Sequence, residues 1–277
     1  VSEIDEKSIG IWVYTLEKKI GVSIIRNPLL TPYLGPYLNI DSKLSATKRL
    51  QVEEKMVSSL MKALPPWDFI EVLCLPSFNN FFSLHLHGLK NIQRLTYHID
   101  LTQEIEQLFL AIDAKQRSAI RQAERELQLE DAATYIPTFY QYYQQTLQLK
   151  GKPYPYSEDL FHNIIHHSLD RKQAFFKAAK NQNGAITAIV FAPYDHQSMY
   201  LLLTATNKDA RHNGAVAFLI WQAIVFAKAH GLKIFDFEGS MDGGIEKFFR
   251  SFGGNRTSYI QATSNQSKLW KLKELMR

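Results

Sequence analysis

Cysteine is almost absent from this sequence: its 277 residues include only Cys74. A single thiol cannot form an intramolecular disulfide, and it excludes a zinc site built from several thiolates. Cys74 lies in an apolar segment typical of a strand, so we expect a buried and unreactive thiol. The sequence therefore provides no redox pair and no activated cysteine nucleophile.

Long hydrophobic runs are also missing. No apolar stretch approaches the roughly 18 residues that a membrane-spanning helix requires. The sequence opens without a charged and then apolar leader that ends in a small-residue cleavage site, which argues against secretion. We therefore predict a cytoplasmic protein that is not an integral membrane protein.

The excess of positive charge is modest, with a net charge of +5 and a pI near 9.1. The basic residues are spread along the chain and do not gather in a tail. Such a charge weakly favours anionic partners such as phosphates, nucleotides or an acidic carrier protein. It gives no reason to expect a DNA partner.

Hydrophobic periodicity predicts an α/β protein with a mixed sheet. Three apolar strands at 174–180, 185–192 and 198–206 are joined by short turns, and a long helix at 213–230 and a strand at 234–237 follow them. The other predicted strands are 9–15, 21–25, 68–75, 95–101 and 257–262, and the other predicted helices are 45–64, 115–125, 136–150, 157–169, 244–252 and 265–276.

Two local details of this pattern can be tested directly. The polar residues 17–19 predict the turn of a hairpin between strands 9–15 and 21–25. Thr102 follows the strand at 95–101 and is a residue type that caps helices, so we expect it to begin the next helix.

The passage from the strand at 198–206 to the helix at 213–230 is the first candidate binding site. A helix N-terminus presents unpaired backbone N–H groups and a positive dipole end, which favour a pyrophosphate or another anion. A simple turn before a buried helix would explain the same residues. The candidate donor-binding residues are Thr204, Arg211, Asn213, Gly214, Ala215 and Val216.

Two acidic residues, Asp236 and Glu238, alternate with Phe235 and Phe237. On a strand, both acids would point to the same face. A carboxylate in a partly apolar cleft has a raised pKa and can deprotonate an attacking amine, so both are candidate catalytic residues. The alternative is that one acid pairs with an arginine, Arg250 or Arg256, and only fixes the loop.

Two segments carry a resemblance to a known family. The residues from Phe235 to Gly254, FDFEGSMDGGIEKFFRSFGG, and the strand and arginine-rich helix between Tyr97 and Arg125 resemble the FemAB-like group of GNAT acyltransferases. The resemblance implies two tandem GNAT-like halves, a degenerate one at 1–105 and a donor-binding one at 106–277, with the acceptor groove between them. Candidate substrate-binding residues are Tyr200, Ser240, Lys247, Phe248 and Arg250.

The nature of the donor depends on a departure from the pattern of this group. Peptidoglycan transferases of the group carry a Phe-Lys pair in the short helix, where this sequence has Phe248 and Phe249, with the cations moved to Lys247 and Arg250. The departure favours a thioester co-substrate, acyl-CoA or an acyl-carrier protein, over aminoacyl-tRNA. We expect no tightly bound cofactor and no metal, although histidines at 85, 87, 162, 166 and 167 have spacings that metal ligands can have.

Three functions are therefore open. The first is an N-acyltransferase in which an amine from a small molecule or the cell envelope attacks a thioester directly. The second is an aminoacyl-tRNA-dependent transferase of the peptidoglycan type. The third is a degenerate GNAT-fold protein that binds a ligand without turnover. The arginines at 117, 121 and 125 could meet phosphates or tRNA, but a solvated, salt-bridged helix face is the favoured interpretation.

Overall fold

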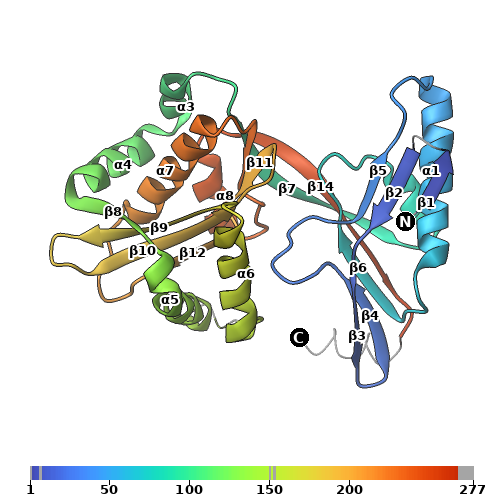
Figure 1. Ribbon diagram of the computed structural model, residues 1–277, viewed down its shortest axis with the longest axis horizontal. Coiled ribbons are helices and arrows are strands. Elements are labelled where there is room, and N and C mark those ends of the chain that lie inside the picture. Colours follow the sequence, from blue (N-terminus) through green and yellow to red (C-terminus); the bar gives the residue numbers. More distant parts are fainter. Residues whose placement is uncertain (1, 6–7, 150, 152–153, 268–277) are drawn as a thin grey trace. The chain divides into compact units, whose positions relative to one another are not determined.

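The computed structural model describes residues 2–5, 8–149, 151 and 154–267 and contains two compact units (Figure 1). The first unit comprises the chain up to Leu95 and the segment that begins at Thr257. The second unit is Thr96–Arg256. The units therefore differ from the predicted halves, because the end of the chain returns to the first unit. The predicted helix at 265–276 lies mainly outside the described residues.

The first unit contains two groups of strands and two helices. Helix α1, which runs from Ala46 to Ala63 with Ser45 before it as predicted, packs against the smaller sheet of β1, β2 and β5. The larger group has the order β14-β6-β4-β3. The bounds are β1 Ser2–Asp5, β2 Ser8–Trp12, β3 Thr15–Lys19, β4 Val22–Arg26, β5 Pro36–Asn39, β6 Phe69–Leu73, α2 Phe81–Leu86 and β14 Asn255–Asn265.

The first unit contains a hairpin near the predicted one, but its strands are β3 and β4 and its turn lies after residues 17–19. Residues 17–19 are not a turn, because they belong to β3, which pairs with β4 in antiparallel fashion. The turn is at Ile20 and Gly21, whose φ angles are 53° and 74°. Two successive positive φ values are the backbone of a tight hairpin turn that matches the twist of its strands. The glycine at the second position was the signal for this turn.

The second unit is built on two further groups of strands. One has the order β12-β10-β9-β8, and the other has the order β11-β13-β7. Strand β7 is longer than predicted, and the third meander strand is divided into β11 and β12. The bounds are β7 Lys90–Asp100, β8 Leu127–Asp131, β9 Ala174–Asn181, β10 Ile186–Pro193, β11 Ser198–Tyr200, β12 Leu203–Thr206 and β13 Ile234–Asp236.

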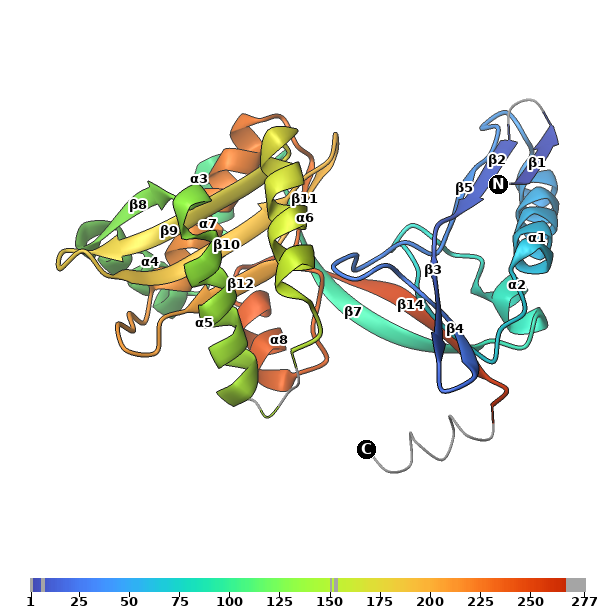
Figure 2. The ribbon, with the colours of Figure 1, turned by 60° about the horizontal axis from the view of Figure 1, so that its bottom comes forward.

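Helices cover both faces of the four-stranded group. Figure 2 shows α5 and α6 in front of β9, β10 and β12, with α4 and α7 behind them, and α7, α5 and α6 contact these strands. This arrangement explains why β10 is apolar except for Thr187: all its residues from Ile186 to Ala192 are buried. The bounds are α3 Ile105–Ala111, α4 Ala114–Glu126, α5 Ile136–Leu149, α6 Glu158–Asp170, α7 Ala215–Ala229 and α8 Gly243–Arg250. Within the described part of the chain, no helix is both long and apolar enough to cross a membrane.

The start of α3 and the arginine-rich face of α4 differ from the predictions. Glu104 precedes α3, and Thr102 instead donates two hydrogen bonds to the carboxylate of Asp100. Arg117 donates to backbone carbonyls at the end of α3, and the Arg121 guanidinium lies 5.2 Å from the centre of the Phe109 ring. Arg117 and Arg121 therefore link α3 to α4 without an ion pair among the described residues, although Arg121 is exposed to solvent as predicted.

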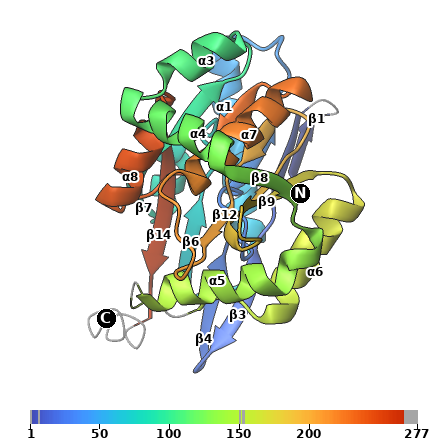
Figure 3. The same cartoon turned by 90° about the vertical axis from the view of Figure 1, so that its left-hand side faces the viewer.

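Helices α4 and α7 approach each other closely, and Figure 3 shows them side by side. The contact depends on Gly214, the residue before α7. A Cβ atom at this position would lie 2.3 Å from the backbone oxygen of Ala119. Gly214 is thus required by helix packing.

We predict that Gly214→Ala destabilises the second unit by about 1–3 kcal/mol, the usual cost of overpacking a fixed backbone contact. Gly243→Ala is the matched control, because a methyl group at this position would meet no other atom within 4 Å and this glycine opens a helix. Urea denaturation followed by circular dichroism measures both. Equal stability of the two variants would contradict the packing role.

Candidate active site

One strand in the second unit changes partners half-way along its length. Its first part, β11, pairs with β13 in parallel, and its second part, β12, pairs with β10 in antiparallel fashion. The change occurs at Leu201 and Leu202, where the Leu201 N–H donates to the Asp236 carbonyl at 2.8 Å. Beyond this bond the two segments separate: β12 joins the four-stranded group, and β13 ends at Asp236. One edge of β12 is therefore without a strand partner among the described residues.

Helix α7 begins directly after β12 and the turn at 207–214. The backbone N–H groups of Val216 and Ala217, in its first turn, have no hydrogen-bond acceptor among the residues that the structure describes. His212 holds the turn in place, because its Nδ1 accepts from the Gly214 N–H at 3.2 Å and its Nε2 lies 2.8 Å from the Glu126 carboxylate. The result is a fixed helix N-terminus with free donors, as an anion site requires.

The predicted donor-binding residues gather at this point of the chain but differ in exposure. Thr204 is half-buried in β12, and Arg211 and Asn213 are exposed in the turn. Gly214 and Ala215 are buried, so only their backbone groups could contact a ligand. Val216 is half-buried. Arg211 forms no hydrogen bond or ion pair within the described part of the chain, which leaves its guanidinium available.

Asp236, the last residue of β13, is a buried carboxylate with several donors around it. Its Oδ1 accepts from the Thr96 hydroxyl at 2.7 Å and from the Glu238 backbone N–H at 2.7 Å. Its Oδ2 lies 3.0 Å from Nε2 of His98. The side chain is therefore committed to holding strand β7 and the next turn. A threonine and a histidine are therefore among the partners of this acid.

Glu238 does not lie on the strand, so the expectation that both acids share one strand face is wrong. Strand β13 ends at Asp236, and Glu238 has a φ of 57°. The left-handed conformation turns the chain away from the strand and is uncommon for a residue other than glycine. Gly239 follows with a φ of 74°, so the two residues together make the turn.

The carboxyl group of Glu238 is largely withdrawn from water. Its Oε1 atom is buried and has no hydrogen-bond donor among the described residues. Burial raises the pKa of Glu238 well above its ordinary value, and the negative charge of Asp236 raises it further. A carboxyl group with a raised pKa binds a proton more readily than an ordinary glutamate, as a general base requires.

The charge of this carboxyl group affects the pKa values of two tyrosines, Tyr143 and Tyr156. Burial raises the pKa of Tyr143, and the neighbouring Tyr156 and the charge of Glu238 add to the shift. Burial and then Glu238 likewise raise the pKa of Tyr156. Their rings are stacked at 18° with centroids 6.4 Å apart. Tyr143 is in α5, and Tyr156 precedes α6.

The predicted substrate-binding residues have defined places, and several already have partners. The Tyr200 hydroxyl donates to Asp195 at 3.1 Å, and the Ser240 hydroxyl accepts from the Asp242 N–H at 3.0 Å. In α8, Phe248 packs against Phe252, Arg250 lies 3.6 Å from Glu246, and Lys247 is exposed. None of the contacts described for these residues joins them to Glu238.

Sequence reasoning did not identify four residues that shape this site: Thr96, His98, Tyr143 and Tyr156. Thr96 and His98 are two residues apart on a strand, so their side chains share one face and could meet an acid on a neighbouring strand. The tyrosines are part of a tyrosine-rich segment in which no pattern marks those that face a carboxyl group. The pairing of β7 with β13, which the sequence does not state, brings His98 opposite Asp236.

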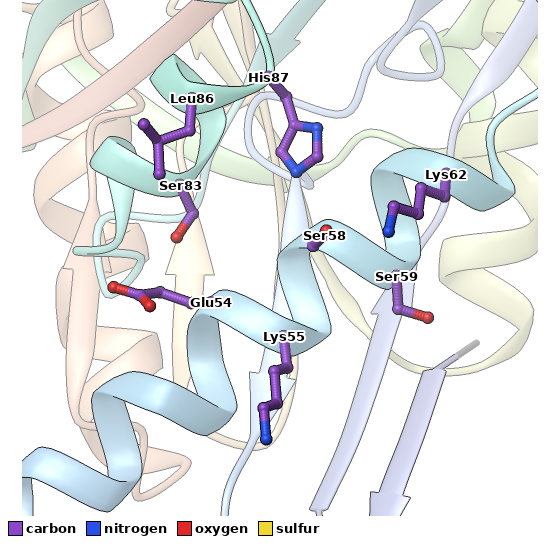
Figure 4. Close-up of a pocket in the computed structure, with 8 residues that line it drawn as sticks. All are labelled: Glu54, Lys55, Ser58, Ser59, Lys62, Ser83, Leu86 and His87. Carbon is purple, nitrogen blue, oxygen red and sulfur yellow. The ribbon is translucent and has the colours of Figure 1, made fainter.

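The first unit holds a separate cavity of about 520 Å³ between α1 and α2. Figure 4 shows Lys55, Ser58, Lys62 and His87 among its lining side chains, none of which was predicted to bind substrate. Across the described residues, no three histidine, cysteine, aspartate or glutamate side chains are grouped as metal ligands. The spaced histidines at 85 and 87 therefore have no metal-binding partners there.

The raised pKa of Glu238 has a measurable consequence for stability. Above 4.5, its ordinary pKa, the unfolded chain loses a proton that the folded protein keeps, so stability falls as pH rises toward the folded-state pKa. We predict that Glu238→Gln is more thermostable than the parent protein above that pH, by roughly 2–4 °C for each kcal/mol of relieved desolvation. Thermal melts over a pH series measure this difference.

The advantage of Glu238→Gln should disappear below the ordinary glutamate pKa of 4.5, where both folded and unfolded chains are protonated. Glu124→Gln, which changes an exposed glutamate on α4, is the control and should show no pH-dependent gain. A pH-independent difference for Glu238→Gln would mean that the carboxyl group is not neutral in the folded protein.

Comparison with known proteins agrees with this architecture. A family model described as an acetyltransferase (GNAT) domain matches residues 112–250. The crystal structure of FemX is similar with a TM-score of 0.67 and 13% identity, covering 99% of this chain and 88% of that one. The C-terminal domain of a putative lysylphosphatidylglycerol synthetase from Agrobacterium fabrum is similar with a TM-score of 0.58 and 13% identity, covering 98% of this chain and 87% of that one.

A tandem GNAT protein from the clavulanic acid biosynthesis pathway is also similar, with a TM-score of 0.51 and 9% identity over 95% of this chain and 84% of that one. Its similarity agrees with the predicted GNAT fold in two halves. No curated protein sequence matches the chain. At these identities the solved structures show the fold, and the chemistry must be argued from the residues.

Proposed function

Because the chain belongs to the acetyltransferase (GNAT) domain family, whose model matches half of it, we propose that it is an N-acyltransferase that moves an acyl group from a thioester to an amine. The observation that carries the proposal is the strand that changes partners at Leu201 and Leu202. It leaves an open strand edge, a helix N-terminus with free N–H groups and the carboxyl group of Glu238 in the same unit.

The reaction needs no covalent intermediate. The amine nitrogen attacks the thioester carbonyl, the C–N bond forms, and the C–S bond breaks with departure of the thiolate. The Glu238 carboxylate takes the proton that the attacking nitrogen loses. Backbone N–H groups at the open edge of β12 would stabilise the oxyanion, and fixed positions of both reactants would supply much of the rate.

The donor would lie against the start of α7. The free N–H groups of Val216 and Ala217 suit a pyrophosphate, and the exposed Arg211 can add a charge-assisted contact. These features support acyl-CoA, or the phosphopantetheine arm of an acyl-carrier protein, as co-substrate without a tightly bound cofactor. Cytoplasmic location and an acceptor from a small molecule or the cell envelope stay predictions.

The two acidic residues have different roles in this proposal. Asp236 is a positioning residue, because its oxygens are engaged by Thr96, His98 and the backbone of Glu238. Glu238 is the catalytic base, because its Oε1 has no protein donor among the described residues and its pKa is raised. The alternative donor is aminoacyl-tRNA, as the FemAB-like resemblance implies. The uncharged Phe248 and Phe249 pair, where those enzymes carry Phe-Lys, supports the thioester.

A donor panel tests the function and its alternatives. Acetyl-CoA, longer acyl-CoA, an acyl-carrier thioester and aminoacyl-tRNA are each incubated with the protein and a set of primary amines. Free thiol release and amide formation with a thioester are the expected result. Amide formation only with aminoacyl-tRNA favours the second function, and thioester binding without turnover favours a degenerate binding protein. No binding of any donor contradicts all three.

We predict that Glu238→Gln lowers kcat for acyl transfer by about 10²–10⁴, the range for loss of a general base. Donor affinity, measured by calorimetry with the thioester or coenzyme A, should change little because the α7 N-terminus is intact. In the parent protein, kcat/KM should fall as pH falls through a pKa that lies above the ordinary glutamate value of 4.5. An unchanged acid limb in Glu238→Gln would assign that limb to another group.

A further inference from the structure

Helix α2 of the first unit presents three large apolar side chains to water. Phe81 is 50% exposed, Phe82 is 55% exposed and Leu86 is 64% exposed, all within a helix of six residues. Single exposed apolar residues are normal on a protein surface, whereas a contiguous group marks a surface that another molecule covers. Phe82 and Leu86 are four residues apart, so they lie on the same side of the helix. We call these three residues the α2 patch.

The buried side of the same helix holds the α2 patch in place. Leu84 is fully buried, and the N–H and hydroxyl groups of Ser83 both donate to Oδ1 of Asn80, at 3.2 and 2.8 Å. At the other end, the N–H groups of His87 and Leu89 donate to the Leu84 carbonyl. The apolar side chains of α2 are therefore exposed as part of the folded structure, and fraying of the helix does not explain them.

The cavity of about 520 Å³ between α1 and α2 adjoins the α2 patch and has a surplus of cations. Helix α1 contributes Lys55 and Lys62 to the lining, and Leu86 and His87 line it from the side of α2. Neither lysine side chain forms an ion pair or a hydrogen bond with another described residue. The lining includes one acid, Glu54, against these two lysines and the histidine. Leu86 belongs both to the cavity and to the α2 patch, so the two features are continuous.

The cavity also offers neutral hydrogen-bond donors. Ser58 and Ser59 line it from α1, and their hydroxyl groups form no hydrogen bond with another residue that the structure describes. Figure 4 shows the His87 ring directed from the end of α2 toward α1. Ammonium and hydroxyl groups are donors that phosphate oxygens accept, and charge assistance makes the contacts with lysine the stronger ones. The cavity thus has the donors for a phosphate group and an apolar surface beside them.

We propose that the first unit docks on an anionic membrane surface, with a phospholipid headgroup phosphate in the cavity between α1 and α2 and the α2 patch at the boundary of the acyl chains. Exposed aromatic and aliphatic side chains next to lysines are the combination that binds an anionic lipid interface. A free phosphate would use the lysines but leave the α2 patch in water. A protein partner is a poorer match, because lysine is depleted in the cores of protein interfaces. This surface goes beyond the proposed acyl transfer, whose residues belong to the second unit.

The charged part of the surface is tested by co-sedimentation of the full chain with vesicles. Vesicles of equimolar phosphatidylcholine and phosphatidylglycerol should bind the protein, and vesicles of phosphatidylcholine alone should bind it at least about tenfold less. The double variant Lys55→Gln/Lys62→Gln should weaken binding about 10- to 30-fold, because each lysine near an anionic surface contributes roughly fivefold. Lys115→Gln/Lys233→Gln is the matched control. It removes the same charge from exposed positions in the second unit and should change binding by less than about twofold.

The apolar part is tested with Leu86→Ser, which should weaken vesicle binding about 5- to 20-fold by removing a side chain that the lipid buries. Leu110→Ser is the matched control, because Leu110 is 66% exposed on α3 of the second unit and should not affect binding. Thermal melts of both variants should match the parent protein, since each replaces an exposed side chain.

Several results would overturn the membrane surface. They are equal binding to the two kinds of vesicle, no vesicle binding by the parent protein, and equal effects of Leu86→Ser and Leu110→Ser. Calorimetric binding of inorganic phosphate by a protein that does not bind vesicles would assign the cavity to a soluble phosphate instead. The donor panel reports on the second unit alone, so acyl transfer and membrane docking stand or fail separately.

Discussion

The second unit depends on one buried carboxylate, that of Asp236. It accepts hydrogen bonds from Thr96 on strand β7 and from the backbone N–H of Glu238, and it lies next to His98. A buried charge without partners would cost several kcal/mol, so these donors are a condition for the fold and not an addition to it. Through them, one side chain fixes the neighbouring strand, the end of β13 and the left-handed turn that follows. The position of Glu238 is therefore set by a residue two places before it.

Glu238 illustrates the cost of this arrangement. The backbone of Glu238 is strained, and its Oε1 atom lacks a donor among the described residues. The negative charge of Asp236 also opposes the ionisation of Glu238 and raises its pKa. Each of these features lowers stability, and none is needed to build the sheet or its helices. Natural proteins break such local rules mainly at functional or strained sites. The same features describe a carboxyl group that is ready to receive a proton from a substrate.

The sequence was sufficient for most elements and insufficient for what joins them. Helix α1, the meander strands and α7 follow from hydrophobic periodicity, since each buries an apolar face or, in β10, both faces. The predicted position of the hairpin turn was wrong because the charged residues 17–19 lie in an exposed strand, and the turn is made where Gly21 adopts a positive φ. The strand face predicted for Glu238 was wrong because alternation holds only while a strand continues, and β13 ends at Asp236. His98 and Tyr143 could not be placed at the site, because only long-range pairing and packing bring them there.

The break in the strand ladder and the turn at Glu238 have a common origin. The Asp236 carbonyl accepts the Leu201 N–H, and this is the last hydrogen bond before β12 turns to β10. Asp236 is the last residue of β13, and both its backbone and its side chain form hydrogen bonds. A closed ladder offers a substrate neither free N–H groups nor space, whereas a ladder that stops offers both, next to a helix N-terminus. Glu238, whose Oε1 has no donor among the described residues, follows the end of β13 by two residues, so the candidate site lies where regular strand pairing ends. Buried polar groups need hydrogen-bond partners, and here a bound substrate would supply them.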